Sequence, residues 1–146
     1  MFIGEYDHNV DAKGRVSVPA KYISGAESEK FYITKGTTDR CLFVYPEEEW
    51  QKICGKLESL PTITNPKAAD FVRTFAAGAY ECEVDKLGRI NIPLKQRIYA
   101  GIEKSVKILG VRNRFEIWDS EIWNEKEQSI NLESTLETMS EIGLDF

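Results

Sequence analysis

Short apolar segments with the two-residue alternation of β-strands occur along the chain between segments that have the spacing of helices. In the first part of the chain, strands are predicted at residues 6–10, 15–18, 31–35 and 41–45. Pro19 favours a short helix through Ile23, because proline suits the first turn of a helix. The pattern therefore predicts a mainly β domain with flanking helices, of the α+β class.

Two longer helices are predicted between residues 46 and 78. Pro46 and the three glutamates after it favour a helix start, since acidic side chains stabilise the positive end of the helix dipole. An apolar stripe follows at helical spacing, formed by Trp50, Ile53, Cys54, Leu57 and Leu60. Asn65 is a predicted N-cap, Pro66 a predicted helix start and Gly78 a predicted stop.

A segment near the N-terminus is repeated later in the chain. Residues 6–22 match residues 80–96 at an offset of 74, and seven of the 17 positions are identical. At an offset of 73, residues 42–50 then match residues 115–123, so each unit spans about 45 residues. The second unit is predicted to have strands at 80–84, 90–92, 106–111 and 115–118, with helices from Pro93 to about Ala100 and from Asp119.

A unit of this size buries too little apolar area to be stable alone. The two copies are therefore expected to complete one composite domain with an approximate two-fold axis. We predict four segments in the chain: repeat 1 at 5–48, a helical linker at 49–78, repeat 2 at 79–122 and an acidic helical tail at 123–146.

Charge is distributed unevenly, which changes the meaning of the formal net charge of −5. Residues 116–146 contain nine of the 24 acidic residues and one of the 19 basic residues, a net charge of −8. Residues 1–115 contain the other 15 acidic and 18 basic residues, a net charge of +3. Nucleic acid therefore stays a possible partner of the body.

The acidic tail has its own apolar pattern. Leu132, Leu136, Met139 and Ile142 recur at helical spacing. We expect this stripe to pack on its own subunit or on a neighbour, with the carboxylates facing water and away from any DNA. The alternative is a frayed terminus, as is common at chain ends.

The most closely repeated residues form a turn in each unit, Asp11-Ala-Lys-Gly-Arg15 and Asp85-Lys-Leu-Gly-Arg89. Four of them are interpreted as turn-forming residues, because Asp accepts backbone N–H groups two residues on and Gly adopts the positive φ that closes such a turn. These four are Asp11, Gly14, Asp85 and Gly88.

Two interpretations of the turn arginines, Arg15 and Arg89, stay open. Each guanidinium can form an ion pair with the aspartate four residues earlier. With Lys13 and Lys86 beside them, the arginines can also contact phosphate and guanine, since a guanidinium is permanently charged and fork-shaped.

Catalytic and metal chemistry find little support. Glu81, Glu83 and Asp85 alternate along one strand face, but the chain has a single histidine, His8, and no calcium-loop motif, so no metal site is expected. It also has no glycine-rich phosphate loop and no nucleophile elbow. We expect no enzyme activity, no cofactor and no small-molecule substrate.

The cysteines and the hydropathy pattern bear on the compartment. Cys41, Cys54 and Cys82 lack C-x-x-C spacing and lie in apolar patterns, so buried reduced thiols are expected. The longest uncharged stretch is residues 59–66, far shorter than a membrane-spanning helix, and residues 1–5 have no signal-peptide pattern. These features predict a cytoplasmic protein without a membrane partner.

Taken together, these motifs resemble the MraZ family, bacterial regulators built of two SpoVT/AbrB-like domains. The resemblance covers about residues 1–125 and depends on the initial Met-Phe-Ile-Gly-Glu-Tyr, the paired D-x-x-G-R turns, the V-S-V-P and I-N-I-P strands and the Y-P-x-x-x-W and F-E-I-W-D blocks. It implies two swapped-hairpin AbrB-like β-barrel repeats related by a pseudo-two-fold axis. It also implies a ring-shaped homo-oligomer that binds double-stranded promoter DNA with short direct repeats, upstream of the division and cell-wall gene cluster.

The resemblance further implies that the turns recognise DNA. This role maps onto Lys13, Gly14 and Arg15 in the first turn and onto Lys86, Gly88 and Arg89 in the second, shaped by Asp11 and Asp85. Leu87 stands where the first turn has Lys13. We therefore expect a nucleoid-associated transcriptional regulator. The alternative is a ring-forming protein-interaction scaffold whose arginines serve subunit contacts.

Overall fold

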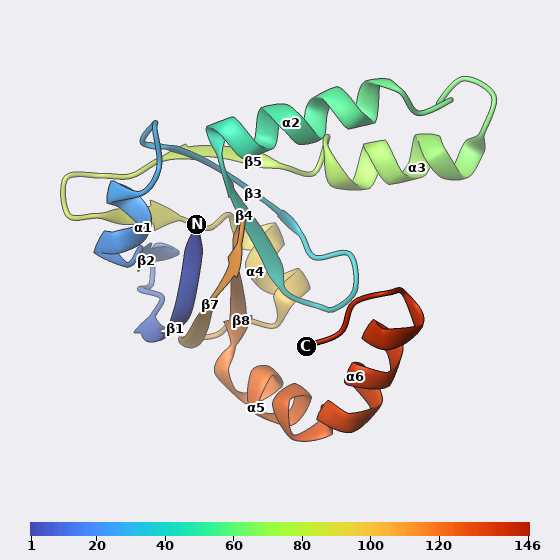
Figure 1. Ribbon diagram of the computed structural model, residues 1–146. Coiled ribbons are helices and arrows are strands. Elements are labelled where there is room, and N and C mark those ends of the chain that lie inside the picture. Colours follow the sequence, from blue (N-terminus) through green and yellow to red (C-terminus); the bar gives the residue numbers. More distant parts are fainter.

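The computed structural model describes residues 1–146, which form eight strands and six helices (Figure 1). The first half of the chain contains β1 (Phe2–Asn9), β2 (Arg15–Ser17), α1 (Ala20–Ser24), β3 (Lys30–Lys35), β4 (Leu42–Pro46), α2 (Glu47–Glu58) and α3 (Pro66–Phe75). The second half contains β5 (Tyr80–Glu83), β6 (Arg89–Asn91), α4 (Leu94–Ala100), β7 (Ser105–Arg112), β8 (Phe115–Asp119), α5 (Ser120–Ser129) and α6 (Leu132–Glu141). The order of elements is the same in both halves, and the α+β class is confirmed.

The strands form two antiparallel sheets in which the halves interleave. The larger sheet has the order β1-β7-β8-β4-β3-β5, and β2 pairs with β6 in a separate two-stranded ribbon. The first strand of each half is hydrogen-bonded to the third strand of the other, β1 to β7 and β5 to β3. Every sheet therefore depends on both halves, as expected for units too small to fold alone.

The larger sheet is covered on both faces. Leu42 and Val44 of β4 point into a core that also contains Val16 and Ile90 of the ribbon. Phe43 and Tyr45 of β4 point the other way, into an aromatic cluster that also contains Trp50 of α2 and Phe75 of α3. The continuous apolar run at the predicted strand 41–45 is explained by this two-sided burial, because alternate residues enter different cores.

The ends of α3 have identifiable causes. The Asn65 side chain accepts hydrogen bonds from the backbone N–H groups of Lys67 and Ala68 at 3.0 and 3.2 Å, which confirms the predicted N-cap. The helix ends at Phe75, before the predicted stop at Gly78. The Thr34 hydroxyl donates to the Phe75 carbonyl at 2.8 Å, so the buried sheet provides the partner that a further helical turn would have provided.

One expectation needs correction and another is narrowed. Cys41 and Cys82 are buried as expected, and burial raises the pKa of the Cys82 thiol to about 12. Cys54 is only partly buried, because its position on α2 lies at the margin of the aromatic cluster. Of the two surfaces predicted for the apolar stripe of α6, its own chain does not provide one, since Leu132 is 70% exposed and Leu136 44%. Packing on a neighbouring subunit stays a prediction.

No helix combines the length and the apolar character that a membrane crossing requires.

Candidate nucleic-acid interface

The first turn is closed by its own aspartate. Asp11 Oδ1 accepts hydrogen bonds from the backbone N–H groups of Lys13 and Arg15 at 3.0 and 2.9 Å, and Asp11 Oδ2 accepts from Arg15 Nε at 2.7 Å. The backbone N–H of Gly14 donates to the Asp11 carbonyl at 3.0 Å. A segment of five residues thus defines its own shape, and its arginine is held by its aspartate.

The second turn repeats this geometry. Asp85 Oδ1 accepts from the backbone N–H groups of Leu87 and Arg89, both at 2.9 Å, and Asp85 Oδ2 accepts from Arg89 Nε at 2.9 Å. The predicted aspartate–arginine ion pair is therefore present in both turns. In neither turn does an Nη group of the arginine have a hydrogen-bond partner within the chain.

The glycines serve the turns and connect them to the opposite half. Gly14 has φ +87° and Gly88 has φ +77°, which confirms the predicted positive φ. The Gly14 carbonyl accepts from the backbone N–H of Ile92 and the Gly88 carbonyl accepts from that of Val18, both at 2.8 Å. Each turn is therefore anchored to the strand end of the other repeat.

The ribbon formed by β2 and β6 places both arginines on one face. Val16 pairs with Ile90, and both are 1% exposed, so the residues on either side of them face outward. Arg15 lies opposite Asn91, two residues beyond Arg89, and such diagonal positions are about 7–8 Å apart. Two residues 74 positions apart in the chain thus meet on one small surface.

Hydrogen bonding keeps both turn aspartates charged. The backbone N–H of Arg15 contributes most to holding the pKa of Asp11 below its ordinary value, assisted by the Arg15 guanidinium and the Lys13 N–H. The pKa of Asp85 is lowered by the equivalent groups, with the Arg89 N–H first. Lys13 and Lys86 are exposed at the turn tips.

The surroundings of the two turns differ, which the sequence analysis missed. A Cβ on Gly14 would lie 3.0 Å from the Arg97 guanidinium, whereas a Cβ on Gly88 would meet the Ile23 methyl group at 3.4 Å. Arg97 takes part in no ion pair, and its Nε donates to the Ile92 carbonyl at 3.0 Å. Its position in the repeat, 74 residues after Ile23, could have signalled this difference.

The backbone carbonyls that hold the start of each turn come from different residues. The Lys104 carbonyl accepts from the Val10 N–H at the first turn, and the Glu29 carbonyl accepts from the Val84 N–H at the second. Glu29 lines a hollow together with Asp85, whereas Lys104 lines one with the acidic residues at the start of α5. The cation that distinguishes the first turn is therefore Arg97 alone.

α6 lies away from both turns. Figure 1 shows the loop between β5 and β6 and the turn between β1 and β2 at the left of the molecule, beside α1, while α6 lies at the lower right. α5 lies between them at the bottom of the molecule, and its first residues line a hollow with Lys104 and Ser105, next to the strand end that leads into the first turn. The expectation that the carboxylates are kept away from the turns therefore fits α6 better than α5.

Comparison with known proteins identifies the family. The model described as "MraZ protein, putative antitoxin-like" matches residues 1–73 and again residues 75–143. A protein named transcriptional regulator MraZ from Acetivibrio thermocellus is 50% identical to this chain, and one from Thermoanaerobacter pseudethanolicus is 47% identical. Both alignments cover 99% of this chain and the whole of the relative. One from Halothermothrix orenii is 54% identical over 84% of each chain. These relatives are named as regulators and not as enzymes, and the chain belongs to the MraZ family.

Proposed function

We propose that this chain is a sequence-specific DNA-binding transcriptional regulator that reads promoter DNA through its paired D-x-x-G-R turns. The observation that carries the proposal is the placement of Arg15 and Arg89 on one outer face of the β2–β6 ribbon. The major groove of B-DNA admits a two-stranded ribbon, and arginine forms bidentate contacts with guanine there.

The ion pairs within the turns support this role. Each aspartate binds the Nε atom of its arginine, which fixes the direction of the guanidinium and leaves the Nη groups without a partner in the chain. An arginine oriented in advance loses less conformational entropy when it binds. The two interpretations of these arginines are therefore compatible: the aspartate positions the side chain, and the Nη groups contact the base.

The finer features of the function are also part of the proposal. The operator would consist of short direct repeats upstream of the division and cell-wall gene cluster, bound by a ring-shaped homo-oligomer in the cytoplasm at the nucleoid. The exchange of first strands between the halves supports the swapped-hairpin AbrB-like barrel. The division of the chain at 5–48, 49–78, 79–122 and 123–146 is proposed on the same basis.

The test is DNA binding by the purified protein on its own upstream region. Arg15→Ala and Arg89→Ala should leave the melting temperature unchanged but weaken specific binding by about 1–3 kcal/mol for each lost bidentate contact, and more where several subunits bind together. Arg73→Ala is the matched control, because Arg73 is exposed and its ion pair with Asp70 lies on α3. Equal binding by all three variants would refute the role of the turns.

Salt dependence separates DNA binding from a role as a protein scaffold. Binding to DNA should weaken steeply as salt is raised, because phosphate contacts release counterions. Fluorescence anisotropy with a labelled operator, measured at several salt concentrations, gives this slope. If the arginines served only subunit contacts, their removal would change the assembly mass and leave any DNA binding as it was.

A further inference from the structure

Two apolar surfaces of the chain have no partner within it. The first is the C-terminal segment after α5, where the apolar side chains are between 44% and 96% exposed: Leu132, Leu136, Ile142, Leu144 and Phe146. Residues 127–146 contain five acidic residues and no lysine or arginine. This segment is therefore both apolar and uniformly acidic, and of its apolar stripe only Met139 is partly covered by its own chain.

The second surface is a groove between the α2–α3 helical pair and the loop that joins β3 to β4. The groove has a volume of about 400 Å³, and Tyr45, Leu57 and Phe75 contribute to its apolar lining. Phe71, which is 42% exposed, separates it from an adjoining hollow of about 420 Å³. Together the two hollows form one depression, which we call the hairpin groove.

The charged side chains of the hairpin groove have the opposite sign to the tail. Lys56 lines the first hollow, and Lys35 and Lys67 line the second. Arg114 also lines the first hollow, but its charge is paired with Glu116, whose Oε2 lies 2.8 Å from Arg114 Nη2. The one carboxylate in the lining is Asp70, and its Oδ1 is already 2.9 Å from Arg73 Nη1. The groove is thus an apolar depression with a mainly cationic rim.

We propose that the hairpin groove binds the C-terminal segment of a second copy of this chain. An amphipathic helix binds such a groove through apolar residues at i, i+4 and i+7, and Leu132, Leu136 and Met139 have this spacing. The ten residues of α6 span about 15 Å. The rim cations would neutralise a row of like charges, Glu133, Glu137 and Glu141, that otherwise destabilises the helix.

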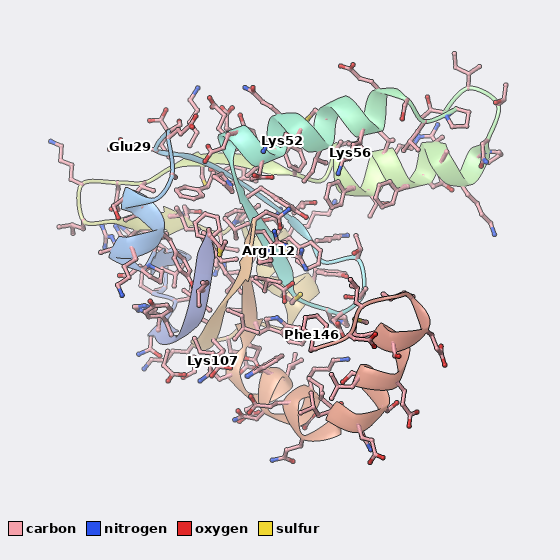
Figure 2. All side chains as sticks on the ribbon, in the orientation of Figure 1. Glu29, Lys52, Lys56, Lys107, Arg112 and Phe146 are labelled. Carbon is pink, nitrogen blue, oxygen red and sulfur yellow. The ribbon has the colours of Figure 1, made fainter.

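The occupant is a second copy because the segment lies away from the groove of its own chain. In Figure 2, Lys56 lies on α2 near the top of the view and Phe146 lies well below it. Most of the groove lining comes from the first half of the chain and the segment belongs to the second, so the contact joins unlike surfaces. Each copy offers one groove and one segment, and a contact of this kind repeats head to tail, which gives a ring when its rotation closes and a filament when it does not. The inference rests on the self-assembly included in the proposed function.

A mixing experiment tests this contact without DNA. Phe71→Glu places a charge in the groove, and Leu136→Glu places one in the apolar stripe of α6. At a concentration where the wild type is assembled, light scattering should show each variant alone at the monomer mass of 16.7 kDa. A one-to-one mixture should form a species of twice that mass, because the intact segment of one variant fits the intact groove of the other.

Two control variants add the same charge elsewhere. Ser134→Glu changes the polar side of α6, and Ala77→Glu changes an exposed residue outside the groove lining. Both should assemble like the wild type. If Phe71→Glu fails to fold by circular dichroism, Lys56→Glu at the exposed rim replaces it, with the same expected result.

Three results would overturn the proposal: wild-type assembly by both groove and segment variants, no association on mixing, or loss of assembly by the controls as well. Binding of the segment to its own chain predicts the second result. A failure of DNA binding alone would leave the contact standing, since none of these measurements includes DNA.

Discussion

Arg15 and Arg89 show how one side chain can be structural and functional together. Nε of each guanidinium binds the aspartate of its own turn, and the Nη groups face outward without a partner. The same turn sequence therefore stabilises a local shape and presents a hydrogen-bond donor. What distinguishes the two turns lies outside them, in the residues that support Gly14 and Gly88.

Arg97 is expected to contribute to DNA binding at the first turn. Its guanidinium lies beside Gly14 without an acidic partner, whereas Ile23 occupies the equivalent position beside Gly88 in the second turn. Arg97→Ala should weaken binding to all DNA sequences to a similar extent and lower the salt slope by about 1, as for a phosphate contact. Anisotropy titrations on specific and random duplexes measure both effects. Loss of binding on the specific duplex alone would contradict a phosphate contact.

The pH dependence of the turns follows from Asp11 and Asp85. Both have a pKa below the ordinary value of 3.8, mainly because backbone N–H groups stabilise the carboxylates. Their contribution to stability is fully present above the unfolded pKa of about 3.9 and is lost as the pH falls through the lower folded pKa. An NMR titration of the carboxyl carbons should show midpoints for both aspartates below the ordinary value of 3.8. A midpoint at or above that value would show that the hydrogen bonds do not stabilise the carboxylates.

At the scale of elements, the two helical pairs differ in how they are held. The α2–α3 pair packs on the aromatic face of the sheet, where the Phe75 and Trp50 ring centroids are 5.7 Å apart. The α5–α6 pair occupies the equivalent place in the second half, but α6 buries no residue. After α3 the chain continues into β5 of the sheet, and α3 buries Ala69 and Phe75. We propose that a second copy of the chain covers α6.

Capping variants measure this difference. Asn65→Ala removes two hydrogen bonds at the start of α3 and should lower the free energy of unfolding by about 1 kcal/mol, because α3 belongs to the core. Asn131→Ala removes the corresponding hydrogen bond to the Ser134 N–H in α6. It should reduce helix content but leave the unfolding of the monomer unchanged. Urea unfolding followed by circular dichroism compares the two, and equal losses would show that α6 is part of the monomer core.

At the scale of the whole molecule, the turns and the C-terminal segment are separated in space. The turns lie at one side, and α6 lies at the other (Figure 1). Residues 127–146 contain five acidic residues and no lysine or arginine, and this charge close to the turns would repel phosphate. Distance therefore lets one chain keep a DNA-binding surface and an acidic assembly element.

Deletion of residues 129–146 tests this division of roles. The shortened chain should keep the melting temperature of the monomer, since α6 buries no residue in it. Its mass by light scattering should fall to that of a single chain, because the proposed contact is lost. A lower melting temperature of the monomer would show that the segment stabilises its own body.

Much of the local structure follows from the sequence alone. The Asn65 cap and both turns are set by residues close together in the chain, because turn aspartates and helix caps form hydrogen bonds with near neighbours. The alternating pattern also locates the strands, except that β1 begins at Phe2, four residues before its predicted start, where it pairs with β7. Apolar spacing also predicts α6. The internal repeat shows that the halves need each other, since neither can bury enough surface alone.

Only the tertiary structure decides which strands become neighbours and what surrounds the turns. The pairing of β2 with β6 places Arg15 and Arg89 on the same face of the ribbon. The position of α4 places the Arg97 guanidinium beside Gly14. Neither follows from a local pattern, because Arg15 and Arg89 are 74 positions apart in the chain and Gly14 and Arg97 are 83. The exposure of α6 is decided in the same way: its stripe predicts a buried face, but burial requires a surface within reach, which a single chain does not provide.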